Sequence, residues 1–370
     1  RSTGNGMGYM RKLRVATLLG TRPEIIKMSP LLPRFDEEFE HILVHSGQHY
    51  SYDMDRLFFE ELDLRQPDVK LEVGSHPPGT QTGLMMQRFE AALFSDPPDA
   101  VVVHGDTNTT LAGALVAAKY RHRGVSLVHV EAGTRSHNRL QPEEINRRLI
   151  DQVSDVLFVP EDGDLENLRR EGIDVSRAVV TGNTVIESCM RVSKAVQERR
   201  SCVEYGLAPG LYAVVTMHRQ ETVDDPGRLR GVMDALAETG RNLPVLALLH
   251  PRTRKALGGL GLDTQIPGVQ LASPVGYLDM VSLLQDARFC LTDSVEEAAI
   301  LRTPALVLRN ETEHRQYVEC GIHVLVGQDT EKIVGEATAL ATDDVELERR
   351  RSAKVPVRTG ATDRIIATMK

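Results

Sequence analysis

Short apolar runs rich in β-branched residues alternate with longer amphipathic segments along almost the whole chain, and this alternation constrains the fold most strongly. Strand-length runs separated by helix-length segments are typical of parallel sheets built from βα units. In the first half, strands are expected at 13–19, 41–46, 69–73, 100–104, 126–130, 155–159 and 178–180. In the second half, they are expected at 212–216, 244–249, 268–272, 288–292, 304–308 and 322–326. The predicted fold class is therefore α/β.

The pattern restarts after a polar, charge-rich segment at 187–210, which ends in the loop-like sequence GLAPG. A chain of 370 residues, at roughly 150 residues per domain, is expected to form two domains. We therefore expect an N-terminal domain over 11–186, a hinge over 187–210 and a C-terminal domain over 211–354. The amphipathic tail at 355–370 is expected to pack back onto the first domain.

Charge and cysteine content narrow the class of partner. The formal net charge is -8, and the Lys and Arg residues are dispersed rather than clustered, which argues against nucleic-acid binding. The four cysteines show no CxxC spacing, and we expect neither a signal peptide nor an apolar run of membrane-spanning length. We expect a cytoplasmic enzyme that binds small molecules, and neither nucleic acid nor a membrane.

The segment HVEAGTRSHNRLQPEEINRRLID concentrates ionisable groups beside an apolar strand. Glu131 follows that strand directly, at the carboxyl end where open α/β sheets place their ligands. Glu143 and Glu144 fall in the first turn of the next predicted helix, where the helix dipole favours negative charge. In one interpretation, Glu143 pairs with Arg147 and Glu144 with Arg148 along one exposed helix face. In the other, carboxylates from separate elements form an acid/base site.

Three other strand ends of the first half carry polar residues. GTRPEIIKMSPLL places Arg22 and Lys27 in the first turns of a helix, where backbone N–H groups and cations would suit an anion. The alternative is that both are ordinary surface charges. SGQHY places Gln48 and His49 at the same edge, and HGDTNTT places Asp106 there, either as a site residue or as a helix N-cap.

The second half repeats this arrangement, with polar clusters after four of its strands. The residues concerned are His218, Arg219, Glu221, His250, Ser294, Glu297, His314 and Arg315. Because both halves carry such clusters, we expect two crevices that face each other across a cleft between the domains.

Ten segments, in order, resemble the UDP-N-acetylglucosamine 2-epimerase family, and the resemblance covers nearly the whole chain. They are GTRPEIIKMSP, SGQHY, HGDTNTTLAGAL, HVEAGTR, PEEINRRLID, VTGNTVIE, MHRQET, HPRT, DSVEEA and RNETEH. The resemblance implies two Rossmann-like domains arranged as in B-type glycosyltransferases, a UDP-sugar substrate and a homodimer.

The resemblance also implies roles for several of the candidate residues. The implied catalytic residues are Asp106, Glu131, Glu143, Lys27 and His218. The three acids act on the sugar, and the two basic residues, with Arg22, are associated with the diphosphate. The residues expected to bind substrate are Arg22, Gln48, His49, Arg147, Arg219, Glu221, His250, Ser294, Glu297, His314 and Arg315. Of these, Ser294 and Glu297 correspond to phosphate and ribose contacts.

The implied reaction is elimination followed by re-addition. No carbonyl acidifies the C2 proton of an N-acetylhexosamine, so UDP must leave C1 before a carboxylate can remove that proton. UDP then re-adds, and a proton reaches the opposite face of C2, giving UDP-N-acetylmannosamine. This scheme places carboxylates around C2 and cations around the leaving phosphate, and it requires no metal or nicotinamide cofactor.

The chain departs from the family pattern in three places. The loop between Glu131 and the PEE segment is two residues shorter than in the common bacterial form, DSVEE lacks both glycines of the usual DSGG, and His314 replaces an arginine. A hydrolysing epimerase that releases N-acetylmannosamine, and a 2-epimerase of a UDP-diacetamido-uronic acid, therefore stay open as alternatives. A B-type glycosyltransferase and a non-catalytic UDP-sugar binder fit the acidic residues and the near full-length match less well.

Overall fold

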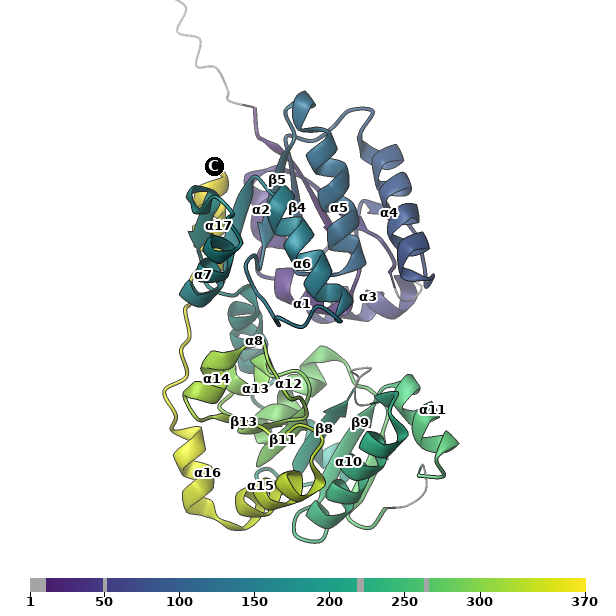
Figure 1. The fold of residues 1–370 in the computed structure, drawn as a ribbon, viewed down its shortest axis with the longest axis vertical. Coiled ribbons are helices and arrows are strands. Elements are labelled where there is room, and N and C mark those ends of the chain that lie inside the picture. The colour runs from purple at the N-terminus through teal and green to yellow at the C-terminus, as the bar shows by residue number, and fades with distance from the viewer. Residues whose placement is uncertain (1–10, 49–51, 218–222, 263–265) are drawn as a thin grey trace, which may run out of the picture. The chain divides into compact units, whose positions relative to one another are not determined.

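The structure is a computed structural model that describes residues 11–48, 52–217, 223–262 and 266–370. The chain divides into two compact units (Figure 1). Unit 1 comprises the residues up to Thr184 together with Gly360–Lys370, and unit 2 comprises Val185–Thr359. The chain thus passes between the units twice, and its last segment belongs to the same unit as its beginning.

Unit 1 is built on a seven-stranded parallel sheet with the order β3-β2-β1-β4-β5-β6-β7. The strands are β1 (Arg14–Leu19), β2 (Glu40–His45), β3 (Val69–Lys70), β4 (Ala100–His104), β5 (Ser126–Val130), β6 (Val156–Val159) and β7 (Ala178–Val180). All five residues of the central strand β4 are buried, and this burial on both faces explains the apolar run of its first four residues.

Helices cover both faces of this sheet, and α4, α5 and α6 lie side by side over one of them (Figure 1). The helices of unit 1 are α1 (Arg22–Met28), α2 (Leu32–Glu38), α3 (Tyr52–Glu61), α4 (Pro78–Leu93), α5 (Asn108–Lys119), α6 (Pro142–Val153), α7 (Asp162–Arg170) and α17 (Ala361–Met369), with short 3-10 turns at η1 (Arg121–Arg123) and η2 (Val175–Arg177). The C-terminal helix α17 is fastened to this unit, since Arg364 donates to the carbonyl of Thr181 at 2.8 Å and Asp363 pairs with Arg34 at 2.8 Å.

Unit 2 is built on a six-stranded parallel sheet with the order β10-β9-β8-β11-β12-β13. Its strands are β8 (Ala213–Met217), β9 (Val245–Leu249), β10 (Val269–Ala272), β11 (Phe289–Thr292), β12 (Ala305–Val307) and β13 (His323–Leu325). Its helices are α8 (Thr184–Ala195), η3 (Ser201–Tyr205), α10 (Pro226–Thr239), α11 (Pro251–Gly259), α12 (Tyr277–Asp286), α13 (Glu296–Ile300), α14 (Arg315–Glu319), α15 (Thr330–Thr342) and α16 (Asp344–Arg351).

The predicted fold class is confirmed, and each of the thirteen expected strands is present within a few residues of its expected bounds. The largest difference is β3, which ends at Lys70 instead of 73 because Glu72 adopts a left-handed backbone with φ 52°. The segment expected as a hinge, 187–210, holds most of α8 and all of η3, and it belongs to unit 2. None of the described helices is long and apolar enough to cross a membrane.

Candidate active site

Glu131 stands at the carboxyl end of β5 with a left-handed backbone, φ 72°, which is uncommon for any residue except glycine. Its carboxylate contacts Lys27 of α1, with Oε2 2.7 Å from Nζ, and lies 3.4 Å from Nε2 of His104 at the end of β4. The Glu131 side chain is only 12% exposed and that of Lys27 14%. Backbone strain that is retained beside buried charges is typical of functional sites.

Glu24 fixes the start of α1, the helix that carries Lys27. One oxygen of its buried carboxylate accepts hydrogen bonds from the backbone N–H groups of Gly20 and Thr21, and the other accepts from the hydroxyls of Thr107 and Thr110. Burial raises the pKa of Glu24, and these hydrogen bonds oppose that rise. The loop after β1 and the loop after β4 are thereby held together by one side chain.

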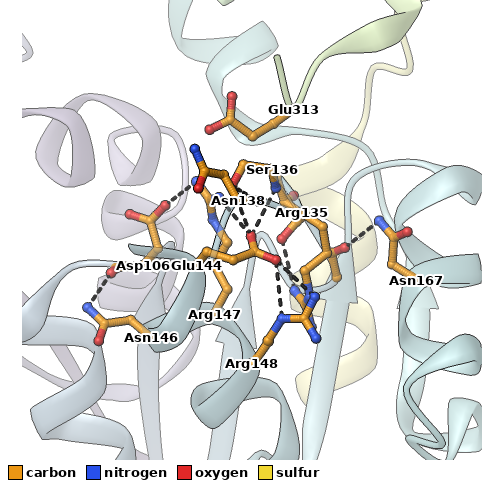
Figure 2. A network of polar contacts seen from close by, with 12 residues as sticks. Asp106, Arg135, Ser136, Asn138, Glu144, Asn146, Arg147, Arg148, Asn167 and Glu313 are labelled. Carbon is orange, nitrogen blue, oxygen red and sulfur yellow. Dashed lines mark hydrogen bonds and ion pairs between the residues drawn. The ribbon is translucent and has the colours of Figure 1, made fainter. Parts of the chain in front are cut away.

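Asp106 follows β4 and forms an ion pair with Arg147 of α6, with a distance of 2.5 Å between Oδ2 and the guanidinium. Asn146 donates to the backbone carbonyl of Asp106 at 2.8 Å (Figure 2). The alternative that Asp106 is a helix N-cap is wrong, because Thr107 caps α5 and accepts from the N–H of Thr110. Asp106 instead lies two residues after β4, at the edge of the sheet where the neighbouring strand β5 also ends.

Glu144, the second acid of the PEE segment, is fully buried at the centre of a polar network (Figure 2). Its carboxylate accepts from the N–H of Ser136 at 2.9 Å and contacts Arg148 at 3.2 Å and Arg147 at 3.5 Å. The predicted pair of Glu144 and Arg148 is therefore confirmed, but its predicted place on an exposed helix face is wrong, since Glu144 is inside. Among the described residues, none forms an ion pair with Glu143, which is partly buried in the first turn of α6.

A second buried network lies behind these acids and was not identified from the sequence. His129 of β5 contacts Asp151 of α6 through Nδ1 at 2.7 Å and the carbonyl of Gly105 through Nε2 at 2.8 Å. Asp151 also pairs with Arg135 at 2.7 Å and accepts from the N–H of Gly133 at 3.1 Å. Burial opposes ionisation of Asp151, but His129 and Arg135 outweigh it and lower the pKa of this carboxyl. The Gly105 and Gly133 contacts fix the two loops that carry Asp106 and Glu131.

The remaining candidates of unit 1 are held by neighbouring side chains. Arg22, the first residue of α1, has its Nε 3.4 Å from Asp55 and its guanidinium 5.1 Å from the ring centre of Phe58. Gln48 is buried, and its amide oxygen accepts from the N–H of Thr109 at 3.0 Å. Neither Arg22 nor Lys27 is an ordinary surface charge, so that alternative is wrong.

The sequence predicted that the carboxylates would surround the sugar and the cations would lie apart from them, around the phosphate. For two of the acids this is wrong, because Lys27 contacts Glu131 and Arg147 contacts Asp106. Each carboxylate thus has a cation of its own. In both pairs, opposite charges meet in a partly buried setting.

In unit 2, Ser294 is exposed between β11 and α13, and its N–H donates to the hydroxyl of Thr292. Glu297 is partly buried in the first turn of α13. Burial raises the pKa of Tyr277 and of Cys189 well above their usual values, and the charge of Glu297 adds to both shifts. Ser294 and Glu297 lie after the carboxyl end of β11, and their contact with a nucleotide stays a prediction.

Two further candidates of unit 2 occupy helix starts. His250 caps α11, with Nδ1 accepting from the N–H of Arg252 at 3.3 Å. His314 precedes α14, where its ring stacks on Tyr317 at 5.7 Å and lies 3.7 Å from Glu296. Arg315 is exposed in the first turn of α14. The candidates that lie outside the described residues are His49, His218, Arg219 and Glu221.

The described part of the chain contains no group of three or more His, Cys, Asp or Glu residues placed to hold a metal ion. The site in unit 1 can instead perform proton transfer, because Asp106 and Glu131 leave adjacent strand ends as paired, partly exposed carboxylates. Two parallel α/β sheets with such acids at the carboxyl edge define an enzyme of the Rossmann-like α/β class that works on a small molecule.

Comparison with known proteins identifies the family. The sequence profile described as UDP-N-acetylglucosamine 2-epimerase matches residues 34–370. A UDP-N-acetylglucosamine 2-epimerase of Methanocaldococcus jannaschii is 38% identical over 367 residues, covering 96% of this chain and 98% of the relative. The chain belongs to the UDP-N-acetylglucosamine 2-epimerase family, whose members are isomerases.

Two further matches bear on the substrate and the fold. A UDP-2,3-diacetamido-2,3-dideoxy-D-glucuronate 2-epimerase of Pseudomonas aeruginosa is 40% identical over 332 residues, covering 88% of this chain and 91% of the relative. The crystal structure of the M. jannaschii UDP-GlcNAc 2-epimerase in complex with UDP-GlcNAc and UDP matches with a TM-score of 0.87, over 96% of this chain and 99% of that one.

Proposed function

We propose that this protein interconverts UDP-N-acetylglucosamine and UDP-N-acetylmannosamine by eliminating UDP to a 2-acetamidoglucal and adding it back. The observation that carries the proposal is the Glu131 carboxylate, held by Lys27 on a strained backbone at the end of β5. Asp106 follows the neighbouring strand, and Glu143 lies in the first turn of α6, so the proposal draws on acids from three elements.

In this scheme the C1–O bond to UDP breaks first, Glu131 then accepts the C2 proton, and the electrons of the C2–H bond form the C1=C2 double bond. On return, a protonated carboxyl delivers a proton to the other face of C2 while a UDP oxygen bonds to C1. Inversion thus needs acids on two faces, and Asp106 or Glu143 would supply the second. Lys27 stabilises Glu131 as the carboxylate before the reaction, at a separation of 2.7 Å.

A product assay tests the proposal against its alternatives. Incubation with UDP-N-acetylglucosamine, followed by NMR, should give UDP-N-acetylmannosamine with UDP still attached to the sugar. The P. aeruginosa relative supports a second candidate, a UDP-diacetamido-uronic acid, which should be tested in parallel. Free N-acetylmannosamine as the first product would indicate the hydrolysing reaction, and conversion of only the uronic acid would replace the proposed substrate.

We expect Glu297→Ala to weaken UDP binding by about 1 to 3 kcal/mol, because a carboxylate that accepts from ribose hydroxyls loses those hydrogen bonds. Glu297 is partly buried at the start of α13, after β11, as such a contact requires. Titration calorimetry with UDP measures the change, and Glu319→Ala, an exposed acid of α14, is the matched control. Equal UDP affinity in the Glu297 variant and the wild type would remove Glu297 from the nucleotide site.

The proposal includes a homodimer, for which the family resemblance is the support. Light scattering coupled to size-exclusion chromatography should give twice the chain mass of 41.0 kDa. A mass equal to that of one chain would contradict this part of the proposal.

A further inference from the structure

Helix α6 buries charged side chains where a helix that packs on a sheet normally buries apolar ones. Glu144, Arg147 and Asp151 lie on one face of α6, at spacings of three and four residues, and all three are buried. Ile145 and Leu149, four residues apart, are instead about half exposed. Paired charges inside a protein seldom stabilise it more than well-packed apolar residues would. The charges on this face therefore point to a role beyond holding α6 in place.

Asp151, the last of these charges, connects the two loops that carry acids of the site. Its Oδ1 lies 2.7 Å from Nδ1 of His129, and Nε2 of the same ring lies 2.8 Å from the carbonyl of Gly105 in the loop after β4. Its Oδ2 accepts from the N–H of Gly133, in the loop after β5, at 3.1 Å. One buried carboxylate and one buried imidazole thus link the two loops.

The donors and acceptors of this link are fixed by its partners. A carbonyl can only accept, so Nε2 of His129 carries a proton and donates it to Gly105. Oδ2 of Asp151 faces two donors, the N–H of Gly133 and the guanidinium of Arg135 at 2.7 Å, and is therefore an acceptor. An asparagine at this position could keep both links, because its amide oxygen can accept from Gly133 and its NH2 group can donate to Nδ1 of His129.

Gly133 is held on its other side as well. Asn167 of α7 donates to its carbonyl at 3.0 Å (Figure 2). A Cβ added at Gly133, which has φ 82°, would lie 2.4 Å from the backbone oxygen of Asp164, so the backbone of α7 is in direct contact with this residue. Glu131, two residues earlier, has a left-handed backbone, a strained conformation that persists only where surrounding contacts impose it. The contacts of Gly133 therefore help to place the Glu131 carboxylate.

We propose that Asp151 is a positioning residue for the reaction, because it links the loop of Asp106 to the loop of Glu131 and thereby sets the placement of the two carboxylates. This inference rests on the proposed epimerisation, in which acids act on two faces of C2. Groups that act on one carbon must stand at a fixed separation, and a displacement of about 1 Å can lower a rate by about 100-fold. No contact with substrate is assigned to Asp151.

Two substitutions at position 151 separate the link from the charge. Asp151→Asn can keep both hydrogen bonds, and we expect its kcat to stay within about threefold of the wild type. Asp151→Ala removes both, and we expect kcat to fall on the order of 100-fold while KM and UDP affinity change by less than about twofold. In both variants Arg135 keeps Glu171 as a partner at 2.8 Å. An Asp151→Ala enzyme at wild-type speed, or an Asp151→Asn enzyme as slow as Asp151→Ala, would overturn the proposal.

Asn167→Ala tests the same placement without touching the buried charges. It frees only the carbonyl of Gly133, and because Asn167 is partly buried the variant should fold. We expect a smaller fall in kcat, about tenfold, at unchanged UDP affinity. A wild-type kcat in this variant would contradict the proposal even if Asp151→Ala does not fold.

Asp155→Ala is the matched control, because this acid holds β5 at the end opposite to Glu131. Its Oδ2 accepts from the N–H of Leu127 at 2.8 Å, and its Oδ1 lies 2.8 Å from Arg121. We expect this variant to lose stability and to keep its kcat, since Asp106 and Glu131 follow the other ends of their strands. A fall in kcat equal to that of Asp151→Ala would assign both effects to a general loosening of the sheet and would overturn the proposal.

The link itself can be observed without any substrate. In protein labelled with 15N at histidine, the Nε2–H of His129 should give a resonance protected from exchange with water, because its 2.8 Å bond to Gly105 is buried. His129→Gln identifies this resonance by its absence. Its persistence in Asp151→Ala, or its loss from Asp151→Asn, would refute the link. If the spectra are as expected and the wild type forms no epimerised UDP-sugar, the failure lies in the proposed function and not in the link.

Discussion

Glu131→Gln should lower turnover by on the order of 100-fold or more while UDP affinity stays close to that of the wild type. The amide has the shape of the carboxylate but cannot accept the C2 proton, and it loses the ion pair with Lys27. Measuring kcat by NMR and UDP binding by calorimetry on the same variant separates a loss of catalysis from a loss of nucleotide affinity. The control is Glu166→Gln, which changes a partly exposed acid of α7 that pairs with Arg169, and this variant should turn over normally.

The same experiment in deuterated water tests the route of the proton. The proton taken by Glu131 exchanges with solvent before the opposite face of C2 is protonated, so the product should carry deuterium at C2. Product with protium at C2, or a Glu131→Gln enzyme at full speed, would contradict the assignment of Glu131 as the base.

Glu143 and Glu144 should respond to substitution in opposite ways although they are adjacent. Glu144→Ala removes a fully buried carboxylate from Arg147, Arg148 and the N–H of Ser136, and we expect a loss of about 2 to 4 kcal/mol of stability. At roughly 2 to 4 °C per kcal/mol for a unit of this size, Tm should fall by about 5 to 15 °C. Calorimetry or circular dichroism measures this change.

Glu143→Gln is the counterpart. This residue is partly buried, and no ion pair to it is present in the described parts of the chain, so Tm should move little. If Glu143 delivers a proton to the sugar, kcat should fall by about 100-fold or more. A lowered Tm in the Glu143 variant, together with an unchanged Tm in the Glu144 variant, would contradict this assignment of a catalytic role to Glu143 and a structural role to Glu144.

The sheets were predictable from the sequence because a buried parallel strand is a local signal. All five residues of β4 and the last four of β5 are buried and mostly apolar, and an acid follows each strand within two residues, Asp106 after β4 and Glu131 after β5. Strand ends in one sheet meet at one edge, which is why Asp106 and Glu131 could be placed near each other before any contact was known.

The partners of those residues were not predictable, because they are set by contacts between distant segments. Lys27 and Glu131 are 104 residues apart, and nothing local indicates their 2.7 Å contact. Four-residue spacing suggested an exposed pair for Glu144, but the loop that follows β5 folds over α6, and Ser136 donates to it. The partnership of His129 with Asp151 likewise depends on how α6 lies against β5.

At Glu131, which has a left-handed backbone, a substitution that raises the stability of the fold would also remove the side chain on which function depends. Glycine would relieve the strain there, by on the order of 1 kcal/mol, since it has no Cβ to oppose a φ of 72°. The same change would delete the carboxylate that Lys27 and His104 hold. Variants selected only for heat resistance should therefore collect replacements at position 131 that no longer turn over substrate, so any engineering of this enzyme has to screen thermal tolerance and catalysis together.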